Sequence, residues 1–418
     1  MKALKWGIYL IVFCLPLYLL RFEIFNIPTT VLEIMIYALF LLWLAKSGFK
    51  GLKAIIKENR FLFIAVFLIL LGVSLATLRS WDLRLSAGIW KAWFIDPLLF
   101  FIVFISVIES KKEIRNVFYA LIFSGFVVSL ISLVYLFLGK LDPEGRLQGI
   151  YNSPNYLAMY LAPALIISFF CLLQNYSHEN TRRSPSETSR CASPSLCPAK
   201  AGQPCPLGLW SIFLVSNFSL STLILYCTRS FGAWIGVLAA TGIGLMIWLW
   251  SSGNKKTAII LAVFLLLACV SIYFVKFNTR AGMLSINSRV EIWQQSVWGL
   301  RAYPVLGIGP GTFKDFFPEH PDWQIPQPHN LYLAFLLQTG IIGFLGFILL
   351  LFLFFKSGIK NYKPGIISII GISLMVYILV HGLVDTLYWK NDLSIVFWLV
   401  IGATLVLKSK CQNPNYFK

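Results

Sequence analysis

Residues 288–346 read SRVEIWQQSVWGLRAYPVLGIGPGTFKDFFPEHPDWQIPQPHNLYLAFLLQTGIIGFLG. The stretch begins as an amphipathic segment, passes through a turn rich in glycine and proline and a polar loop, and ends in an apolar run headed by His329-Asn330. The apolar run continues to residue 355 without a charged side chain, and about 20 apolar residues are enough for a helix to cross a bilayer. This apolar run therefore predicts a membrane-spanning helix that has polar, potentially reactive side chains at one end.

The rest of the chain has the same apolar character. Of its 418 residues, 58% are hydrophobic and only 12% are charged, a balance that excludes a soluble globular protein. Runs of membrane-spanning length recur, and they are continuously apolar rather than alternating, which excludes a pore-like β-barrel. We therefore predict an all-α, polytopic integral membrane protein with about twelve transmembrane helices. The predicted spans are residues 6–20, 28–45, 61–78, 92–108, 114–138, 155–173, 209–227, 230–250, 257–275, 329–355, 365–384 and 391–407.

The basic residues give the orientation, because loops rich in Lys and Arg tend to stay in the cytoplasm. With the N-terminus inside, the inner segments hold 22 of the 35 basic residues and 5 of the 17 acidic ones, whereas the outer segments are nearly neutral. Both termini are then cytoplasmic. The net charge of +18 is a topology signal of this kind, so it calls for no nucleic acid partner.

The chain reads as a single membrane domain, residues 1–418, with two long loops. Residues 276–328 form the outer loop, on the periplasmic or extracellular side, between the ninth and tenth predicted helices. We expect short amphipathic helices in it, because apolar side chains recur at helical spacing over residues 286–300. Residues 174–207 form the long inner loop, which is rich in Ser and Pro and is predicted to be a disordered cytoplasmic loop.

Arg229 lies where one apolar span ends and the next begins, in the sequence LYCTRSFGAWIG. An arginine at the membrane boundary is costly unless it is paired or reaches water. The Thr-Arg-Ser sequence also predicts a helix start, whose free N–H groups and positive dipole end favour an anion such as a diphosphate. From the residues alone, an anion site and a side chain that merely reaches to the lipid headgroups are both open.

Three further arginines lie in outer segments. Arg146 stands in GRLQGIYNSPNYLAMYLAP, just before the sixth predicted span, and only two acidic residues nearby could pair with it. Asn155, in the same segment, is expected to cap the incoming helix. Arg289 and Arg301 flank the amphipathic segment, from which they could reach a phosphate near the membrane surface or simply adhere to lipid.

His329 opens the tenth predicted span, with Asn330 next to it. A neutral imidazole can accept a proton from a hydroxyl group or position it, although a single histidine at a helix start is often structural. His381 and Asp385 form another polar cluster, one helical turn apart near the outer end of the eleventh span. Hydrogen bonding between helices is the competing interpretation for those two residues.

Several segments resemble the O-antigen ligase and polymerase family of membrane glycosyltransferases. The resemblance is carried by SR…W, YPVLGIGPGTF and PHNLYL…TGIIG within residues 288–346, by RLQGIYNSPN within 140–163, and by the arginine segment 226–236. It implies transfer of a glycan from a polyprenyl diphosphate carrier to an acceptor hydroxyl on the outer face of the cytoplasmic membrane. It implies catalytic roles for His329 and Arg229, diphosphate binding by Arg146, Arg229, Arg289 and Arg301, and supporting roles for Asn155, Asn330 and Asp385.

The expected reaction is an inverting glycosyl transfer assisted by His329. Departure of a diphosphate needs its charge neutralised, which arginines can do, so neither a metal nor another cofactor is expected. The outer segments contain no Asp-x-Asp motif; a metal-dependent enzyme would use carboxylates such as Asp315, Glu319 or Asp322. The expected partners are the lipid-linked glycan donor, an acceptor hydroxyl on a glycan, lipid or protein, and membrane lipids.

The sequence leaves the acceptor open. A ligase, a glycan polymerase and a protein O-oligosaccharyltransferase of the same superfamily share this chemistry, and the sequence does not separate them. A transporter or flippase is the alternative from a different class. It should show pseudo-repeats with interrupted helices in matching halves of the chain, and we find no such repeat.

Overall fold

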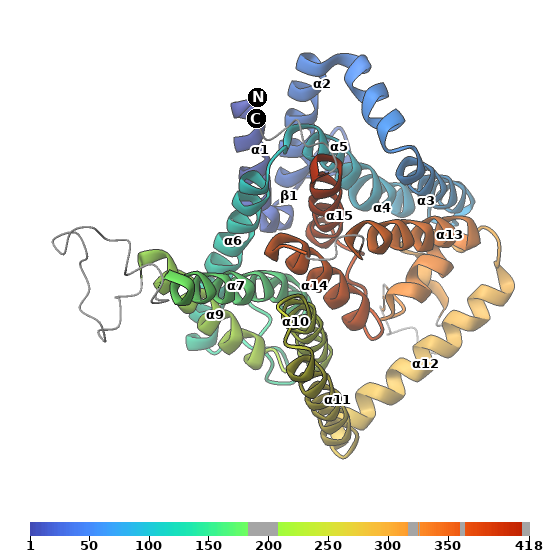
Figure 1. The fold of residues 1–418 in the computed structure, drawn as a ribbon. Coiled ribbons are helices and arrows are strands. Elements are labelled where there is room, and N and C mark those ends of the chain that lie inside the picture. The colour runs from blue at the N-terminus through green and yellow to red at the C-terminus, as the bar shows by residue number, and fades with distance from the viewer. Residues whose placement is uncertain (183–207, 317–324, 326, 360–363, 412–418) are drawn as a thin grey trace. The chain divides into compact units, whose positions relative to one another are not determined.

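The structure, a computed structural model, describes residues 1–182, 208–316, 325, 327–359 and 364–411. Almost all of the regular structure in these residues is helical (Figure 1). The chain divides into two compact units. The first unit joins Met1–Ser124 to Phe231–Lys418, and the second unit is Gly125–Ser230. The single membrane domain expected from the sequence remains a prediction.

Eight helices among the described residues are long and apolar enough to cross a membrane. They are Val31–Glu58, Arg60–Arg79, Leu83–Val107, Lys111–Phe137, Pro154–Tyr176, Leu209–Cys227, Phe231–Ser251 and Leu331–Gly358. Two shorter apolar helices, Ile366–His381 and Asn391–Leu407, coincide with the last two predicted spans. The all-α polytopic membrane fold therefore fits, whereas the total of about twelve spans remains a prediction.

The N-terminal part of the first unit contains a small β-hairpin that the all-α prediction missed. The first helix ends soon before Pro16, which lacks an N–H group and cannot continue a helix. In the hairpin Arg21 pairs with Thr30, and its tight turn holds Phe25 and Asn26 at φ of 50° and 62°. The elements are α1 (Lys2–Phe13), a 3₁₀ helix η1 (Leu15–Leu19), β1 (Arg21–Ile24) and β2 (Ile27–Thr30).

The next helices extend the predicted spans. Where the sequence predicted a span over residues 92–108, the helical path already begins at Leu83, because the Asp82 carboxylate caps it by accepting a hydrogen bond from the Leu85 N–H (3.0 Å). The path includes one π turn. These elements are α2 (Val31–Glu58), α3 (Arg60–Arg79), α4 (Leu83–Trp90), the π turn η2 (Lys91–Ile95), α5 (Asp96–Val107) and α6 (Lys111–Phe137), which enters the second unit at Gly125.

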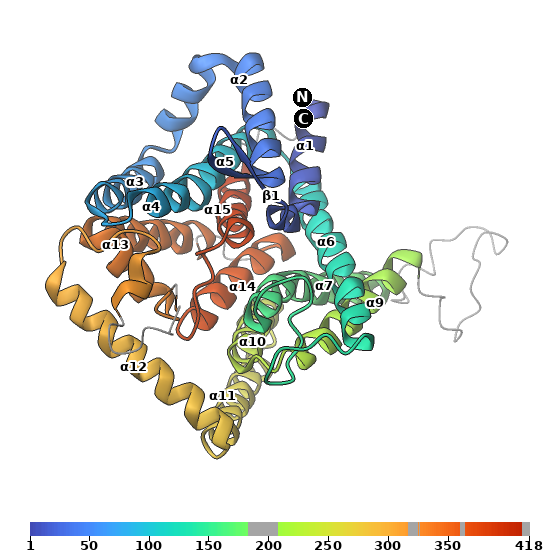
Figure 2. The same cartoon turned by 180° about the vertical axis from the view of Figure 1, so that it is seen from behind.

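The remainder of the first unit follows the second unit in sequence. Its elements are α10 (Phe231–Ser251), α11 (Lys255–Phe277), α12 (Arg280–Ala302), a 3₁₀ helix η4 (Thr312–Phe316), α13 (Leu331–Ile359), α14 (Ile366–His381) and α15 (Asn391–Cys411). In both views α13 lies beside α3 (Figures 1 and 2). A Cβ atom on Gly72 of α3 would lie 2.3 Å from the Gly343 nitrogen of α13, so only glycine permits this approach.

The predicted span 329–355 is interrupted in the structure. Gly340 has φ of 65° and breaks α13, and the Ile341 N–H just after it donates to the Val305 carbonyl (3.1 Å). One turn earlier, the Leu337 carbonyl accepts a hydrogen bond from the Ile308 N–H (2.8 Å). The glycine-rich turn of the outer loop is thus anchored on α13 at its break, which the apolar pattern of the sequence did not indicate.

Among its described residues, the predicted outer loop 276–328 contains one long helix where short ones were expected. The helix α12 has 23 residues, and η4 follows it after a turn. Ile292 of α12 is 4% exposed and packs in a cluster with Leu337 of α13. Val290 and Val297, from the apolar face expected in the sequence, are each 43% exposed. The apolar residues of α12 therefore divide between the core of the unit and its surface.

The second unit consists of the end of α6 with α7 (Pro154–Arg182) and α9 (Leu209–Cys227). α7 packs on α9, and the buried Asn217 side chain of α9 donates to the Ser168 hydroxyl of α7 (2.8 Å). Residues 174–182, which the sequence assigned to a disordered loop, continue α7 as helix. The rest of that loop lies outside the described residues.

Candidate active site

The start of α13 is fixed by two sets of hydrogen bonds around Asn330. The Asn330 side-chain oxygen accepts from the N–H groups of Tyr332 (3.0 Å) and Leu333 (2.9 Å), which makes Asn330 the N-cap of the helix. The Asn330 amide donates to the Leu383 carbonyl (3.0 Å). In addition, the Leu331 N–H donates to the Gly382 carbonyl (2.7 Å). The head of α13 is thereby tied to the turn that follows α14.

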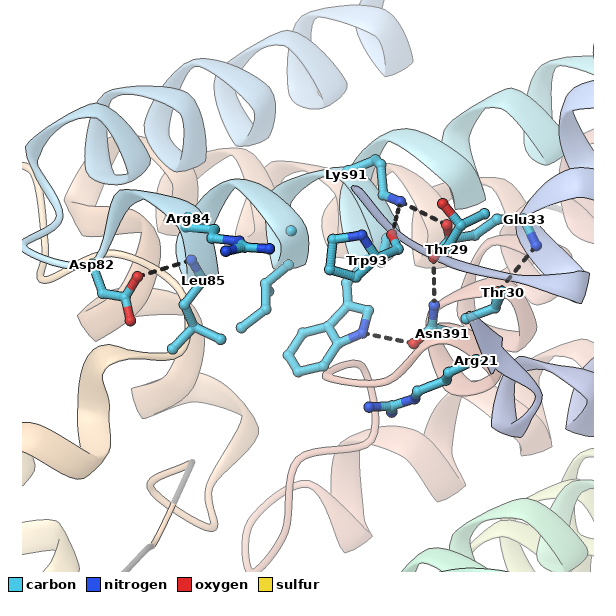
Figure 3. Close-up of a pocket in the computed structure, with 14 residues that line it drawn as sticks. Arg21, Thr29, Thr30, Glu33, Asp82, Arg84, Leu85, Lys91, Trp93 and Asn391 are labelled. Atoms are coloured by element: carbon cyan, nitrogen blue, oxygen red, sulfur yellow. Dashed lines mark hydrogen bonds and ion pairs between the residues drawn. The ribbon is translucent and has the colours of Figure 1, made fainter. Parts of the chain in front are cut away.

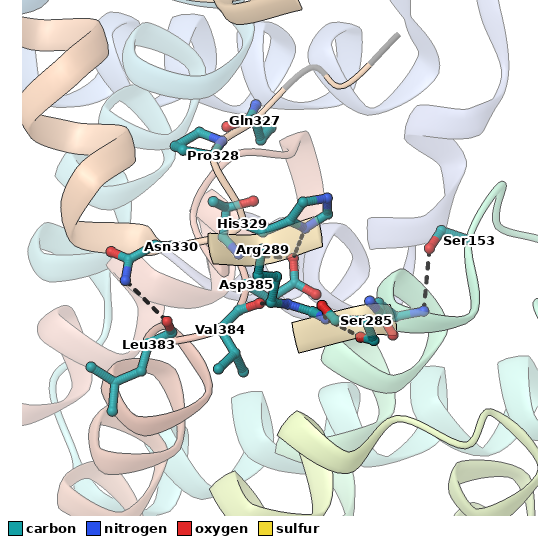
Figure 4. A network of polar contacts seen from close by, with 12 residues as sticks. Ser153, Ser285, Arg289, Gln327, Pro328, His329, Asn330, Leu383, Val384 and Asp385 are labelled. Atoms are coloured by element: carbon teal, nitrogen blue, oxygen red, sulfur yellow. Dashed lines mark hydrogen bonds and ion pairs between the residues drawn. The ribbon is translucent and has the colours of Figure 1, made fainter. Parts of the chain in front are cut away.

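His329 pairs with Asp385 of that turn (Figure 4). The His329 Nδ1 and Asp385 Oδ1 atoms are 3.3 Å apart, and the two side chains are 33% and 4% exposed. The Asp385 Oδ1 atom also accepts a hydrogen bond from the Thr386 N–H (3.0 Å). A buried carboxylate therefore holds one nitrogen of a partly exposed imidazole. In the tautomer with the proton on Nδ1, the Nε2 atom is left to accept a proton.

The charge of Asp385 is stabilised by its surroundings. Burial opposes ionisation and by itself would raise the pKa of this carboxyl group. The hydrogen bond with His329 and the electrostatic interactions with His329, His381 and Arg289 outweigh burial and lower the pKa from 3.8 to about 2. Asp385 is consequently an anion under ordinary conditions, which is the form that orients an imidazole and stabilises its protonated state.

Arg289 of α12 reaches the same turn. Its Nε atom donates to the Val384 carbonyl (3.1 Å), and its Nη1 atom donates to the carbonyl (3.2 Å) and the hydroxyl of Ser285. Figure 4 shows Arg289 beside His329 and Asp385. Arg301 lies twelve residues further along α12, which is roughly 18 Å at the rise of a helix. The structure therefore brings Arg289, but not Arg301, to the histidine.

His381 is not a partner of the Asp385 carboxylate in the way the sequence cluster suggested. The His381 side chain is 1% exposed, and its Nδ1 atom lies 2.9 Å from the Tyr377 hydroxyl, one turn earlier in α14. The observed hydrogen bond is therefore within one helix, whereas the sequence favoured one between helices. The Asp385 N–H donates to the His381 carbonyl (3.1 Å).

Sequence reasoning missed two residues that support the segment before His329. The Trp293 indole N–H of α12 donates to the Pro328 carbonyl (3.1 Å). The buried Gln338 amide of α13 donates to the Gln327 side-chain oxygen (3.2 Å), and the Gln338 oxygen accepts from the Gly311 N–H (2.9 Å). A glutamine in the middle of an apolar span was the available signal for this contact, because such a polar group must find partners.

The second unit holds the other two predicted arginines, Arg146 and Arg229, in two separate connections. The Arg146 Nε atom donates to the Thr228 carbonyl (2.9 Å), and its Nη2 atom donates to the Asn155 side-chain oxygen (2.7 Å). The more exposed Glu144 carboxylate is 3.5 Å from its Nη1 atom. Because α7 begins at Pro154, Asn155 lies inside the helix and serves as a partner of Arg146, which corrects its assignment as a helix cap.

Arg229 lies in the short connection between α9 and α10, with φ of 50°. The side chain is exposed, and its nearest described acceptor is the Glu144 carbonyl, 3.5 Å from Nη1. The loop before α7 thus contains Arg146, and its Glu144 carbonyl is the contact of this loop with Arg229. The guanidinium of Arg229 remains open to an anionic ligand.

Of the three carboxylates named for a metal-dependent alternative, Asp315 lies among the described residues. Asp315 accepts a hydrogen bond from the Trp81 indole (2.9 Å), while Glu319 and Asp322 lie outside the described residues. Within those residues, no group of three or more His, Cys, Asp or Glu side chains is placed to hold a metal ion.

Comparison with known proteins supports the resemblance seen in the sequence. Residues 217–348 match a family model described as O-antigen ligase. The match includes Arg229, Arg289 and His329, and it ends before Asp385. No match was found among curated proteins. The sequence of residues 217–348 is therefore similar to that of the O-antigen ligase family.

Proposed function

We propose that this protein is a membrane glycosyltransferase that moves a glycan from a polyprenyl diphosphate carrier to an acceptor hydroxyl. The observation that carries the proposal is the pair formed by His329 and the buried Asp385 carboxylate, 3.3 Å apart. The family match supports the superfamily of ligases and polymerases. The distribution of basic residues supports a reaction on the outer face of the cytoplasmic membrane, with both termini in the cytoplasm.

His329 serves as the general base. Its Nδ1–H donates to Asp385, and its Nε2 atom takes the proton of the acceptor hydroxyl as the hydroxyl oxygen attacks the anomeric carbon. A new glycosidic C–O bond forms, the bond from the anomeric carbon to the diphosphate oxygen breaks, and configuration is inverted. The protonated imidazole is then stabilised by the Asp385 anion, and the proton later passes to solvent.

The arginines bind the leaving group. Arg229, with its exposed guanidinium, contacts the diphosphate directly. Arg146 holds the Thr228 carbonyl next to Arg229 and so positions that guanidinium, besides adding positive charge. Arg289 adds charge at the imidazole side, while Arg301 binds a more distant phosphate or the membrane surface. Since arginine supplies the neutralisation, the transfer proceeds without a metal or another cofactor.

The acceptor molecule distinguishes the three types of enzyme that could carry out this reaction. An O-antigen ligase transfers to a hydroxyl of another glycolipid, a polymerase to a lipid-linked glycan, and a protein O-oligosaccharyltransferase to a protein side chain. The same base and the same arginines serve all three. A ligase agrees best with the description of the matched family.

The test replaces His329 by Ala in the purified, detergent-solubilised protein. Transfer from a polyprenyl diphosphate-linked glycan should fall by about 10²–10⁴-fold, the usual contribution of a general base, while donor binding stays close to wild type. His178→Ala is the matched control, because His178 lies in the segment 174–207, which the sequence predicts to be cytoplasmic. Transfer by His329→Ala at the wild-type rate would refute the role of the histidine. Loss of wild-type transfer in EDTA, restored by Mg²⁺ or Mn²⁺, would refute the metal-free reaction.

A further inference from the structure

A pocket lies in the first unit, and it is lined by residues other than those of the His329–Asp385 pair. It has a volume of ≈ 400 Å³ and is formed by the β1–β2 hairpin, by α4 with the π turn that follows it, and by the start of α15 (Figure 3). Ligand sites for small molecules have volumes of roughly 300–1,000 Å³, so this pocket can take a compact ligand.

One wall of the pocket is the Trp93 indole, which is held in a fixed orientation. Its N–H donates to the Asn391 side-chain oxygen (3.0 Å), and its ring meets the Trp389 ring edge-on, with centroids 6.0 Å apart. The Asn391 amide in turn donates to the Glu33 carboxylate (3.3 Å). Asn391 and Glu33 are 7% and 3% exposed, so they form the buried floor of the pocket. A rigid aromatic wall above polar groups is typical of sites that bind amphipathic ligands.

The charge of the pocket is positive and is concentrated in two arginines. Lys91 is neutralised by the Glu33 carboxylate at 2.7 Å. Arg84 donates to the neutral Asn26 carbonyl (3.2 Å), and neither Arg84 nor Arg21 forms an ion pair with another described residue. The Asp82 carboxylate, which caps α4, offsets one of the two arginine charges. One net positive charge and two guanidinium groups therefore remain for a ligand.

The arrangement of these groups indicates the ligand. Figure 3 shows the Arg84 and Arg21 side chains on either side of the Trp93 indole. We propose that this pocket binds a sugar unit carrying a carboxylate or a phosphate, with the ring against Trp93 and the anionic group between Arg21 and Arg84. Guanidinium groups bind both anions through paired hydrogen bonds. A lipid headgroup would need only the arginines, whereas the fixed indole and the polar floor suit a sugar ring.

The pocket is joined to the candidate active site by shared packing. The Trp389 ring contacts Trp93 on one side and Phe335 on the other, with centroids 5.5 Å apart in the second contact. Phe335 belongs to α13, the helix that begins just after His329. If the pocket holds part of the glycan during transfer, that role rests on the proposed function. Binding of the sugar itself does not depend on the proposed function.

The test measures binding alone, with glucose 6-phosphate and glucuronate as probes and glucose as the neutral control. Purified protein in detergent is examined by equilibrium dialysis and by saturation-transfer difference NMR. Both anionic sugars should bind, and glucose should bind at least about tenfold more weakly, since it lacks the charge-assisted hydrogen bonds. The double variant Arg21→Gln/Arg84→Gln should lose at least about tenfold in affinity for the anionic sugars. Arg79→Gln is the control, because it removes an exposed arginine of the same unit that does not line the pocket.

Two further measurements separate a sugar from a bare anion or a lipid. Trp93→Ala should lower the affinity for glucose 6-phosphate several-fold but leave the affinity for inorganic phosphate unchanged. Equal affinity for inorganic phosphate and glucose 6-phosphate, or displacement of the sugar by phosphatidylglycerol micelles with no effect of Trp93→Ala, would overturn the proposal. Wild-type affinity in the double variant would overturn it too. The single variant Arg84→Gln, on the rim, serves if the double variant does not fold. His329→Ala should retain sugar binding. An error in the proposed transfer reaction would therefore appear in the transfer assay, and an error in the proposed pocket would appear in the binding assay.

Discussion

The charged groups of two regions have different kinds of partner. The histidine region of the first unit contains His329 and Asp385, and the arginine region of the second unit contains Arg146 and Arg229. In the first, His329 faces the Asp385 carboxylate, an anion that is 4% exposed. In the second, Arg146 donates to a carbonyl and to the neutral Asn155 side chain, and Arg229 approaches only a carbonyl. The partially exposed Glu144, at 3.5 Å, is the only acidic group within ion-pair distance of either arginine among the described residues.

This difference fits two different tasks. A base that must take up a proton gains from a fixed anion beside it, because the anion stabilises the protonated imidazole. A site for a diphosphate gains from cations whose partners are neutral, because those cations keep their charge for the ligand. Both regions also share a feature: His329 and Arg229 have φ of 47° and 50°, a region of backbone conformation that non-glycine residues seldom adopt. Such strain gathers at functional sites.

After the His329→Ala variant described above, the largest effect is expected at Arg229. Arg229→Lys keeps the charge but loses the planar fork that binds a diphosphate through paired hydrogen bonds. We expect transfer to fall by roughly 10²-fold, with normal insertion into the membrane. The measurement is the rate of glycan transfer by purified protein, with Lys140→Gln, another exposed cation of the second unit, as the control. A lysine variant that transfers at a near-normal rate would make Arg229 a membrane anchor and would end the contrast between the two regions.

The next effect concerns the stability that Asp385 confers. Its pKa in the folded protein, about 2, is below the ordinary value of 3.8, so the folded state favours the anion. The stabilisation is therefore fully present above about pH 4 and is lost as the pH falls through about 2; it amounts to about 2 kcal/mol. The unfolding temperature of the wild type should exceed that of Asp385→Asn at pH 5, and the difference should shrink as the pH falls from 4 to 2.

A control variant distinguishes the loss of stability caused by protonation of Asp385 from a general effect of acid. Asp315→Asn removes a carboxylate that accepts a hydrogen bond from the Trp81 indole and lies outside the histidine region. Its unfolding temperature should follow that of the wild type over the same pH range. A constant difference between wild type and Asp385→Asn from pH 5 to pH 2 would show that the carboxylate is not held as an anion by the folded protein.

The sequence predicted the class of the fold because apolar runs of membrane length are a local property. It also indicated His329 and Arg229, since both interrupt apolar sequence with groups that can do chemistry. The hairpin was missed because its strands are four residues each and lie at the end of an apolar run. The break in α13 was missed because Gly340 stands in a continuous apolar sequence, and its positive φ depends on contacts with the outer loop.

Pairings between distant residues could not be read from local patterns. Asp385 is 56 residues from His329, and its sequence spacing suggested His381 as a partner. The turn that carries Asp385 is placed by hydrogen bonds from the head of α13, which only the folded chain provides. The same holds for Asn155, because capping is the common role of an asparagine near a helix start, and its actual partner depends on how the preceding loop folds.

The smallest effect is expected at Asn155, and it addresses the comparison most directly. Asn155→Ala removes the acceptor of a charge-assisted hydrogen bond from Arg146, so transfer should fall about threefold to tenfold through misplacement of the arginine. Asn155→Asp restores an acceptor but adds a negative charge beside the guanidinium. If Arg146 only positions the loop, the Asp variant should recover wild-type transfer. If the loop serves as a cationic site, the Asp variant should bind the lipid diphosphate donor more weakly than wild type, and added salt should reduce the difference between the two. We expect the second result, because the neutral Asn155 side chain leaves more of the Arg146 charge available to the donor than a second carboxylate besides Glu144 would.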